Sequence, residues 1–410
     1  MIIQSDRIIT AADRAPLTDG AIVIRYGRIH AVGNAARLKR LYSGHRIVRL
    51  ERAVIMPGLV NVHAHLELPH MYDEIPSLNY TDWVLRLLAR KKHLTNKDYS
   101  AAARANITAL IRSGTTMVAD ITTHGCSPLL LCQSGIRAII FHEIISMLDD
   151  RSTLVIPRLR PASRLVQYGY SPHSPHTVSE MALKEILRIS NKLKLRLSMH
   201  VAETREETLL LQKKKSSLER LYAAARWDTN KLTEARSSFA YLLRLGLLGP
   251  SFLAVHAVQA DTKDIAIIKR TRTGVAHCPR SNHELGVGTM PLKAFLDAHI
   301  SVGLGTDSLA SVPTLNLWDE MRYAYRVHRR SGVSPQDILH MATIGGARVL
   351  GMDRDIGSIA PGKQTDIIVV PLPRNNTGDL YSDLLRETKT CMMNMVNGRV
   401  IYRNTKFAAR

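Results

Sequence analysis

The 410-residue sequence predicts an α/β fold: a (β/α)8 TIM barrel with a small β-sandwich domain formed from both chain termini. Two observations predict it. Short apolar segments alternate with helical stretches through the middle of the chain, and both ends have the pattern of short strands separated by glycine and polar turns. We expect residues 56–356 to form the barrel and residues 1–55 with 357–410 to form the accessory domain.

Eight apolar segments are the candidate barrel strands. They are GLVNVHAH from 58, TTMVADI from 115, RAIIFHEI from 137, VQYGYSPHS from 166, LKLRLSMH from 193, FLAVHAV from 252, TGVAHCP from 273 and ISVGLGTD from 300. Helical connections between such strands give parallel pairs with right-handed crossovers. The alternative, an open doubly wound sheet, would need a glycine-rich phosphate turn after its first strand, and GxGxxG is absent there.

The two ends of the chain carry the strands of the accessory domain. Near the N-terminus these are AIVIRYGRIHAVG and HRIVRLERAVIMPG, and near the C-terminus they are GSIAPGKQTDIIVV and CMMNMVNGRVIYR. These patterns predict one small domain built from both termini.

The charge balance is strongly basic, with 56 Lys+Arg against 35 Asp+Glu and a net charge of +21. Such an excess can attract nucleic acid, anionic membranes or acidic small molecules. The basic residues are spread along the chain, however, and the densest run is only Lys213 to Lys215. We therefore expect a solvated basic surface, with neither nucleic acid nor membrane as a partner.

Cysteine usage and hydropathy indicate a cytoplasmic protein. Cys126, Cys132, Cys278 and Cys391 are scattered and form no CxxC pair, so neither a disulfide framework nor a cysteine zinc site is expected. No apolar run approaches the roughly 18 residues that span a bilayer, and MIIQSDRIIT does not have the pattern of a secretion signal.

Polar residues gather at the C-terminal ends of the candidate strands. They are His63, His65, Asp120, His142, Glu143, His173, His200, His256, His277 and Asp307. A barrel of this kind builds its active site on that face. The distribution therefore predicts one shared site in the barrel mouth.

Four of these residues have the chemistry of a metal site. Because strand side chains alternate in direction, His63 and His65 point to the same side. His200 ends the fifth strand and Asp307 follows the eighth. Three imidazole nitrogens and one carboxylate suit zinc or iron better than calcium or magnesium. We expect one divalent ion, Zn²⁺, with Fe²⁺ as the alternative.

The sequence resembles the amidohydrolase superfamily in PGLVNVHAHLE, SMHVAETREE, VHAV, HCPRSN, GLGTDSLAS and GSIAPGKQTDIIVV, which together cover nearly the whole chain. The resemblance implies that His63, His65, His200 and Asp307 are the metal ligands. Relatives with two metals carry a bridging lysine after the fourth strand, where this chain has YGYSPHSPHT, so a mononuclear site is expected. The match is to the deaminase and chlorohydrolase branch.

The chemistry expected of this branch is attack by metal-activated hydroxide with release of ammonia. Glu203, three residues after His200, is close enough to take the proton of that water and pass it to a ring nitrogen. His256 matches the family histidine that holds and polarises the hydroxide. Asp307 both binds metal and accepts a proton on its way to the leaving group.

Within the branch the motifs look most like a subgroup that includes aminodeoxyfutalosine deaminases, which act on an adenine nucleoside carrying a benzoate in a menaquinone pathway. Arg280 is the candidate for a substrate carboxylate, because its planar fork binds that group well. Glu67 is the candidate for substrate hydroxyls or amine, and His173 resembles a substrate-contacting histidine. The long connection at about 70–100, with Trp83, is a candidate lid.

Other functions stay open at this point. The same site can serve S-adenosylhomocysteine, methylthioadenosine, guanine, cytosine or a chlorinated triazine. A non-catalytic binding protein is disfavoured because no expected ligand or proton-transfer residue is missing, and nucleic-acid binding would show as salt-sensitive association. Relatives are often dimers or larger, so a homo-oligomer is expected.

Overall fold

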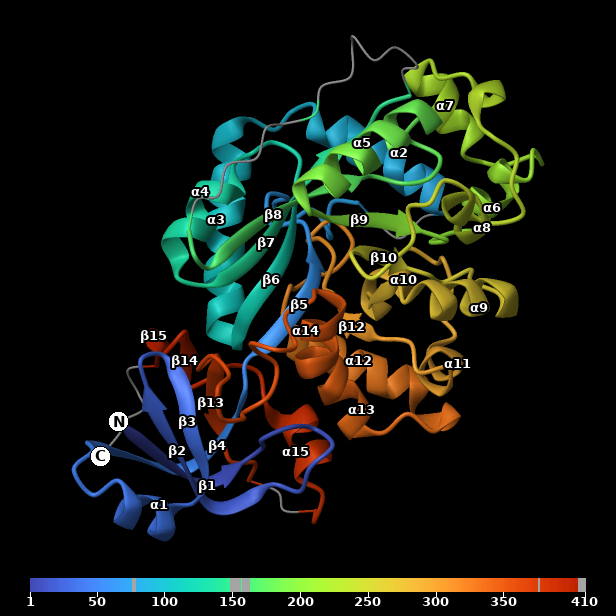
Figure 1. Ribbon diagram of the computed structural model, residues 1–410. Helices are drawn as coiled ribbons and strands as arrows, with labels where there is room; N and C mark the ends of the chain where they lie inside the picture. The colour runs from blue at the N-terminus through green and yellow to red at the C-terminus, as the bar shows by residue number, and fades with distance from the viewer. Residues whose placement is uncertain (76–78, 148–155, 157–162, 375–376, 405–410) are drawn as a thin grey trace.

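The computed structural model describes residues 1–75, 79–147, 156, 163–374 and 377–404, and its centre is an eight-stranded parallel sheet (Figure 1). The strand order β12-β11-β10-β9-β8-β7-β6-β5 follows the chain without interruption. The strands are β5 (Leu59–Ala64), β6 (Thr115–Thr122), β7 (Arg137–Ile144), β8 (Val166–Pro172), β9 (Arg196–Val201), β10 (Phe252–His256), β11 (Gly274–His277) and β12 (Val302–Leu304). All eight predicted strands are thereby confirmed.

Helices connect these strands and surround the barrel (Figure 1). They are α2 (Tyr80–Lys91), α3 (Asn96–Ser113), α4 (Ser127–Ser134), α5 (Glu180–Leu193), α6 (Arg205–Leu211), α7 (Glu219–Ala225), α8 (Ser238–Arg244), α9 (Thr262–Thr271), α10 (Pro279–Glu284), α11 (Leu292–Asp297), α12 (Leu317–His328), α13 (Pro335–His340) and α14 (Gly346–Val349). Two further helices, α1 (Ala35–Leu41) and α15 (Leu380–Glu387), connect strands of the second sheet described below. Single helical turns cover Thr229–Lys231 and Arg329–Ser331, and a π-helical turn covers Met341–Gly345.

The barrel closes where β5 meets the end of β12. A parallel bridge joins Ala64 to Asp307, and the backbone N–H groups of Thr306 and Asp307 donate to the His63 carbonyl at 2.9 and 3.1 Å. Gly305 makes this approach possible, because a Cβ there would lie only 2.9 Å from the Cβ of His63. The last strand can therefore reach the first only with glycine at this position.

Both chain ends build a second sheet of seven strands in the order β15-β14-β13-β4-β1-β2-β3 (Figure 1). Its strands are β1 (Ile2–Ile8), β2 (Leu17–Arg25), β3 (Arg28–Asn34), β4 (Ile47–Pro57), β13 (Ile367–Pro371), β14 (Met393–Val396) and β15 (Arg399–Arg403). The predicted fold class, a barrel with a separate unit formed from the termini, is confirmed. The predicted domain boundaries at 55/56 and 356/357 stay predictions.

A buried ion pair joins the terminal sheet to the base of the barrel. Arg137, the first residue of β7, donates from Nε and Nη2 to the two oxygens of Asp366 at 2.9 and 3.1 Å. The side chain of Asp366 is 1% exposed, and it also accepts from the backbone N–H of Asn397. The backbone carbonyl of Asp366 also accepts a hydrogen bond from the N–H of Gly58, just before β5.

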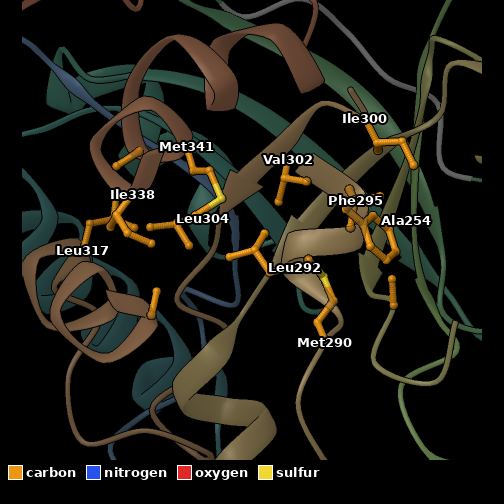
Figure 2. Packing of buried hydrophobic residues seen from close by; sticks show 14 of the residues in the cluster. Ala254, Met290, Leu292, Phe295, Ile300, Val302, Leu304, Leu317, Ile338 and Met341 are labelled. Atoms are coloured by element: carbon orange, nitrogen blue, oxygen red, sulfur yellow. The ribbon is translucent and has the colours of Figure 1, made fainter. Parts of the chain in front are cut away.

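The largest apolar core lies between the barrel strands and the helices outside them. Figure 2 shows Val302 and Leu304 of β12 among Leu292, Phe295, Leu317 and Ile338 of α11 to α13. Each of these side chains is buried, and burial of one large apolar side chain stabilises the fold by about 1.5–3 kcal/mol. This packing supports the strand that carries Asp307 to the barrel mouth.

Among the described residues, no helix combines the length and apolarity needed to cross a bilayer.

Candidate active site

Three histidines converge at the C-terminal mouth of the barrel. His63, His65 and His200 each offer one ring nitrogen, and these atoms lie within 4.8 Å of one another. The Oδ1 atom of Asp307 lies 3.6 Å from Nε2 of His63 and 3.7 Å from Nε2 of His65. The structure therefore brings together the four residues predicted as metal ligands, from β5, β9 and the turn after β12.

The chemistry of this group fits a metal ion. The His63 ring is fully buried, and neither of its nitrogens has a hydrogen-bond partner among the described residues. Burial lowers the pKa of His63 to about 3, so the ring is neutral and able to bind metal. A buried imidazole without a hydrogen bond is costly unless a ligand occupies it, and a divalent cation removes that cost.

Asp307 is held ionised beside these rings. Burial alone would raise its pKa, but the close approach of His63 and the electrostatic influence of His256 and His65 hold the pKa well below its usual range. Ser281 and Ser311 donate to its second oxygen, Oδ2. Oδ1 is left directed toward His63 and His65, which suits a carboxylate ligand.

His200 has a fixed tautomer. Its Nδ1 donates to the carbonyl of His173 at 2.9 Å, so Nε2 carries the lone pair that faces the cluster. A hydrogen bond of this type orients a metal-binding imidazole and raises its basicity.

Glu203 follows His200 through a strained turn. Ala202 has a φ of +52°, and the buried carboxylate of Glu207 accepts from the backbone N–H of Ala202 at 2.9 Å. Tyr80 of α2 donates to Oε2 of Glu203 at 2.9 Å. Burial raises the pKa of Glu203 to about 7, which is the range in which a carboxyl group exchanges protons at neutral pH.

His256 lies on the other side of Glu203, with Nε2 3.5 Å from Oε1. Its Nδ1 donates to Oδ1 of Asn282 at 2.8 Å, and burial lowers its pKa, so Nε2 is an acceptor. His256 and Asp307 both have positive φ, +74° and +59°. Such strain is costly for non-glycine residues and is concentrated here at the predicted site.

A cavity of about 380 Å³ opens above these residues. Its floor is polar, with His65, His200, Glu203, His256 and Asp307, and its walls are largely apolar. The apolar residues are Leu68, Trp83, Val84, Leu87, Leu88, Ile145, Leu221, Ala225, Trp227 and Leu285.

Helix α2 contributes several of the side chains that line this cavity, and an ion pair of 2.7 Å between Asp82 and Arg220 ties it to α7. The two helices lie near each other in Figure 1. Helix α2 belongs to the segment at about 70–100 that was predicted as a lid, of which residues 76–78 lie outside the described residues.

The comparison with protein families matches residues 54–401 to the amidohydrolase family. The chain belongs to this family. The match confirms the predicted family and the predicted class of enzyme, a hydrolase of carbon–nitrogen bonds.

Relatives of this amidohydrolase are adenosine-type deaminases. A 5-methylthioadenosine/S-adenosylhomocysteine deaminase of Moorella thermoacetica is 27% identical, over 93% of this chain and 89% of the relative. A 5′-deoxyadenosine deaminase of Methanosarcina barkeri is 28% identical, over 97% of this chain and 91% of the relative.

Solved structures share the fold. The aminofutalosine deaminase of Helicobacter pylori, in complex with methylthio-coformycin, has a TM-score of 0.88 at 20% identity, over 98% of this chain and all of that one. These comparisons agree with the predicted function, an aminohydrolase acting on an amino-substituted nitrogen heterocycle.

The structure does not bring Glu67 into the cavity of this amidohydrolase. Both of its oxygens accept hydrogen bonds from the turn between β6 and α4: Oε1 from Thr122, Cys126 and Ser127, and Oε2 from Thr123 and His124. The side chain is 2% exposed. Its predicted role in substrate binding is corrected, because six backbone and hydroxyl donors from these five residues hold the carboxylate to the turn, outside the cavity.

Arg280 also lies outside the cavity. Its Nη1 donates to Oγ1 of Thr314 at 3.0 Å and lies 3.7 Å from Oε1 of Glu320. The guanidinium borders a different surface hollow, between α12 and α15. The predicted contact to a substrate carboxylate is therefore corrected. Arg280 instead anchors α10, whose next two residues bind Asp307 and His256.

We expect Arg280→Ala to lower kcat by about tenfold through small shifts of Asp307 and His256. Steady-state kinetics should show equal loss for a neutral nucleoside and for one that carries a carboxylate. Arg280→Lys is the control, because it keeps the charge without the planar fork and should recover only part of the rate. A rise in KM confined to the carboxylate-bearing substrate would restore the role predicted from sequence.

His173 lines the cavity as predicted, with its Nδ1 2.9 Å from Oγ1 of Thr177. The sequence pattern did not assign three residues that support the site. Tyr80 holds Glu203, Asn282 holds His256, and Glu207 holds the turn between His200 and Glu203. Glu143 was noted at a strand end but given no role, although it lines the cavity beside Thr123. Its position near the C-terminal end of β7 was the signal that could have identified it.

Proposed function

We propose that this protein is a metal-dependent aminohydrolase that removes the 6-amino group of an adenine nucleoside as ammonia. The observation that carries the proposal is the placement of Glu203. One of its oxygens faces His256 and the other is held by Tyr80, at the floor of an apolar cavity and next to the histidine cluster.

His63, His65, His200 and Asp307 are the proposed ligands of one divalent ion. Zn²⁺ suits three imidazoles and one carboxylate, and Fe²⁺ is the alternative. When bound, such an ion lowers the pKa of a water ligand from about 15.7 to about 7 and so supplies a nucleophile at neutral pH.

The residues of the chain handle the protons. Glu203, with its raised pKa, accepts the first proton of the attacking water and delivers it to the ring nitrogen beside the reacting carbon. Nε2 of His256 accepts a hydrogen bond from the water and orients it. Asp307 receives the second proton and passes it to the amino group. A C–O bond forms, the C–N bond breaks, and ammonia leaves.

Cavity chemistry favours an adenine nucleoside whose 5′ substituent is apolar. The walls toward α2 and α7 are aliphatic and aromatic. Arg280 lies outside the cavity, and among the described residues Lys91 is the one lysine or arginine that lines it. Aminodeoxyfutalosine, and with it a place in menaquinone biosynthesis, is the second candidate, with Lys91 as the partner of its benzoate.

The test is ammonia release from a panel of purified substrates. We expect 5′-deoxyadenosine and methylthioadenosine to react fastest, aminodeoxyfutalosine more slowly, and guanine, cytosine and a chlorinated triazine not at all. Turnover of a triazine or pyrimidine without any adenine nucleoside would reject the substrate proposal. A cytoplasmic location and a homo-oligomeric state stay predictions.

Metal removal gives a further prediction. Dialysis against a chelator should abolish ammonia release, and one equivalent of Zn²⁺ per chain should restore it, as metal analysis and titration would show. His63→Ala should bind less than a tenth of that metal, because it removes a ligand from a site of four. The control His30→Ala, in an exposed histidine of β3 outside the barrel, should retain full metal content. Full activity after complete chelation would contradict the assignment.

A further inference from the structure

Glu143 is a carboxylate that faces the cavity without an ion-pair partner. It lies near the end of β7, and its Oε2 accepts from the hydroxyl of Thr123 at 2.6 Å. No hydrogen bond to Oε1 and no ion pair within 4 Å is found among the residues that the structure describes. Glu143 is partly buried in a cavity with largely apolar walls, so a ligand group that donates to its remaining oxygen gains a charge-assisted hydrogen bond.

The surroundings indicate what kind of ligand group this is. Lys91 lines the same cavity and already supplies a positive charge there. A cationic ligand group would be repelled there, whereas a neutral hydroxyl can donate to Glu143 without adding charge. The Oγ1 atom of Thr123, which donates to Glu143, still has lone pairs to accept a second hydroxyl.

We propose that Glu143 and Thr123 form a subsite that recognises two hydroxyls on adjacent carbon atoms of the substrate sugar. This inference rests on the proposed function, because it needs a nucleoside in the cavity. Glu143 is in β7 and Thr123 follows β6, whereas many of the apolar side chains that line the cavity come from α2 and α7. In this proposal the sugar contacts the polar residues of β6 and β7, and its 5′ substituent contacts the apolar side chains. Glu143 thereby selects ribonucleosides over deoxynucleosides.

The test compares kcat/KM for 5′-deoxyadenosine and 2′,5′-dideoxyadenosine. The wild-type protein should prefer the first by about 10- to 100-fold, the range expected for a hydrogen bond to a charged acceptor. Glu143→Ala should lose that preference, so that the two substrates differ by less than about threefold, mainly through KM. Thr123→Val should give an intermediate ratio.

Two controls separate this subsite from a structural effect. Glu143→Gln is isosteric, keeps the bond from Thr123, and should fold like the wild type with a partly reduced preference. Glu51→Gln, in an exposed position of β4, should leave both substrates unaffected. If Glu143→Ala slows both substrates equally, the subsite proposal is wrong and the proposed function stands. If the wild type deaminates no adenine nucleoside, both fail.

Discussion

Glu203→Gln should lower kcat by about 10²- to 10⁴-fold, the contribution that general acid–base catalysis makes. Glutamine has nearly the same shape, and its amide can keep the contact with Tyr80, but it neither accepts the proton of the water nor delivers one to the ring nitrogen. Steady-state ammonia release measures the loss. Because burial raises the pKa of Glu203 to about 7, the wild-type pH profile should bend near neutrality, and that bend should be absent in the variant.

Metal content and KM distinguish the loss of proton transfer in Glu203→Gln from a structural disruption of the site. Both should stay close to those of the wild type, since Glu203 is not among the proposed ligands. A matched control is Glu206→Gln, on the first turn of α6 in the same segment, whose carboxylate accepts from Ser217 away from the cavity. It should retain the wild-type rate. Normal turnover by Glu203→Gln would show that protons move by another route.

Arg137→Met should reduce the free energy of unfolding by about 3–5 kcal/mol, because it leaves the buried carboxylate of Asp366 without its counter-ion. Methionine keeps most of the apolar stem of the side chain, so the loss reports the charge pair. Asp366 also anchors the backbone of Asn397 and Gly58, so the terminal sheet and the base of β5 should loosen together. Urea unfolding followed by circular dichroism measures the change.

An exposed pair of the same geometry provides the control. Arg188 forms a two-point contact with Glu185 on α5, at 3.0 and 2.6 Å, but its side chain is 60% exposed. Arg188→Met should cost no more than about 1 kcal/mol. Adding Asp366→Asn to Arg137→Met should recover part of the stability by removing the uncompensated charge. Equal losses for the buried and exposed pairs would contradict this view of the interface.

The barrel and the central group of side chains could be predicted because both follow local rules. Strand ends are visible as apolar runs, and parallel strands collect their C-terminal residues on one face, so His63, His200, His256 and Asp307 could be placed together before any contact was known. Glu203 followed from its short distance in sequence to His200.

The predictions for Glu67 and Arg280 failed where strand geometry no longer applies. β5 ends at Ala64, so alternation says nothing about Glu67, which turns toward the α4 loop. Arg280 lies on a helix, where one position decides which neighbour it meets. Tyr80 meets the site through the packing of α2 over the barrel, a tertiary property that a single sequence does not reveal.

Barrel closure at Gly305 also constrains the order of events in folding. Asn61, just before His63, bonds to Thr306, a residue 245 positions further along the chain. Three of the proposed ligands, His63, His65 and Asp307, lie next to this closure. The complete set of proposed ligands therefore forms only after the eighth strand has been synthesised and has paired with the first. Contacts of such long range form slowly. An ion held by the four proposed ligands would therefore bind late in folding, after the barrel has closed.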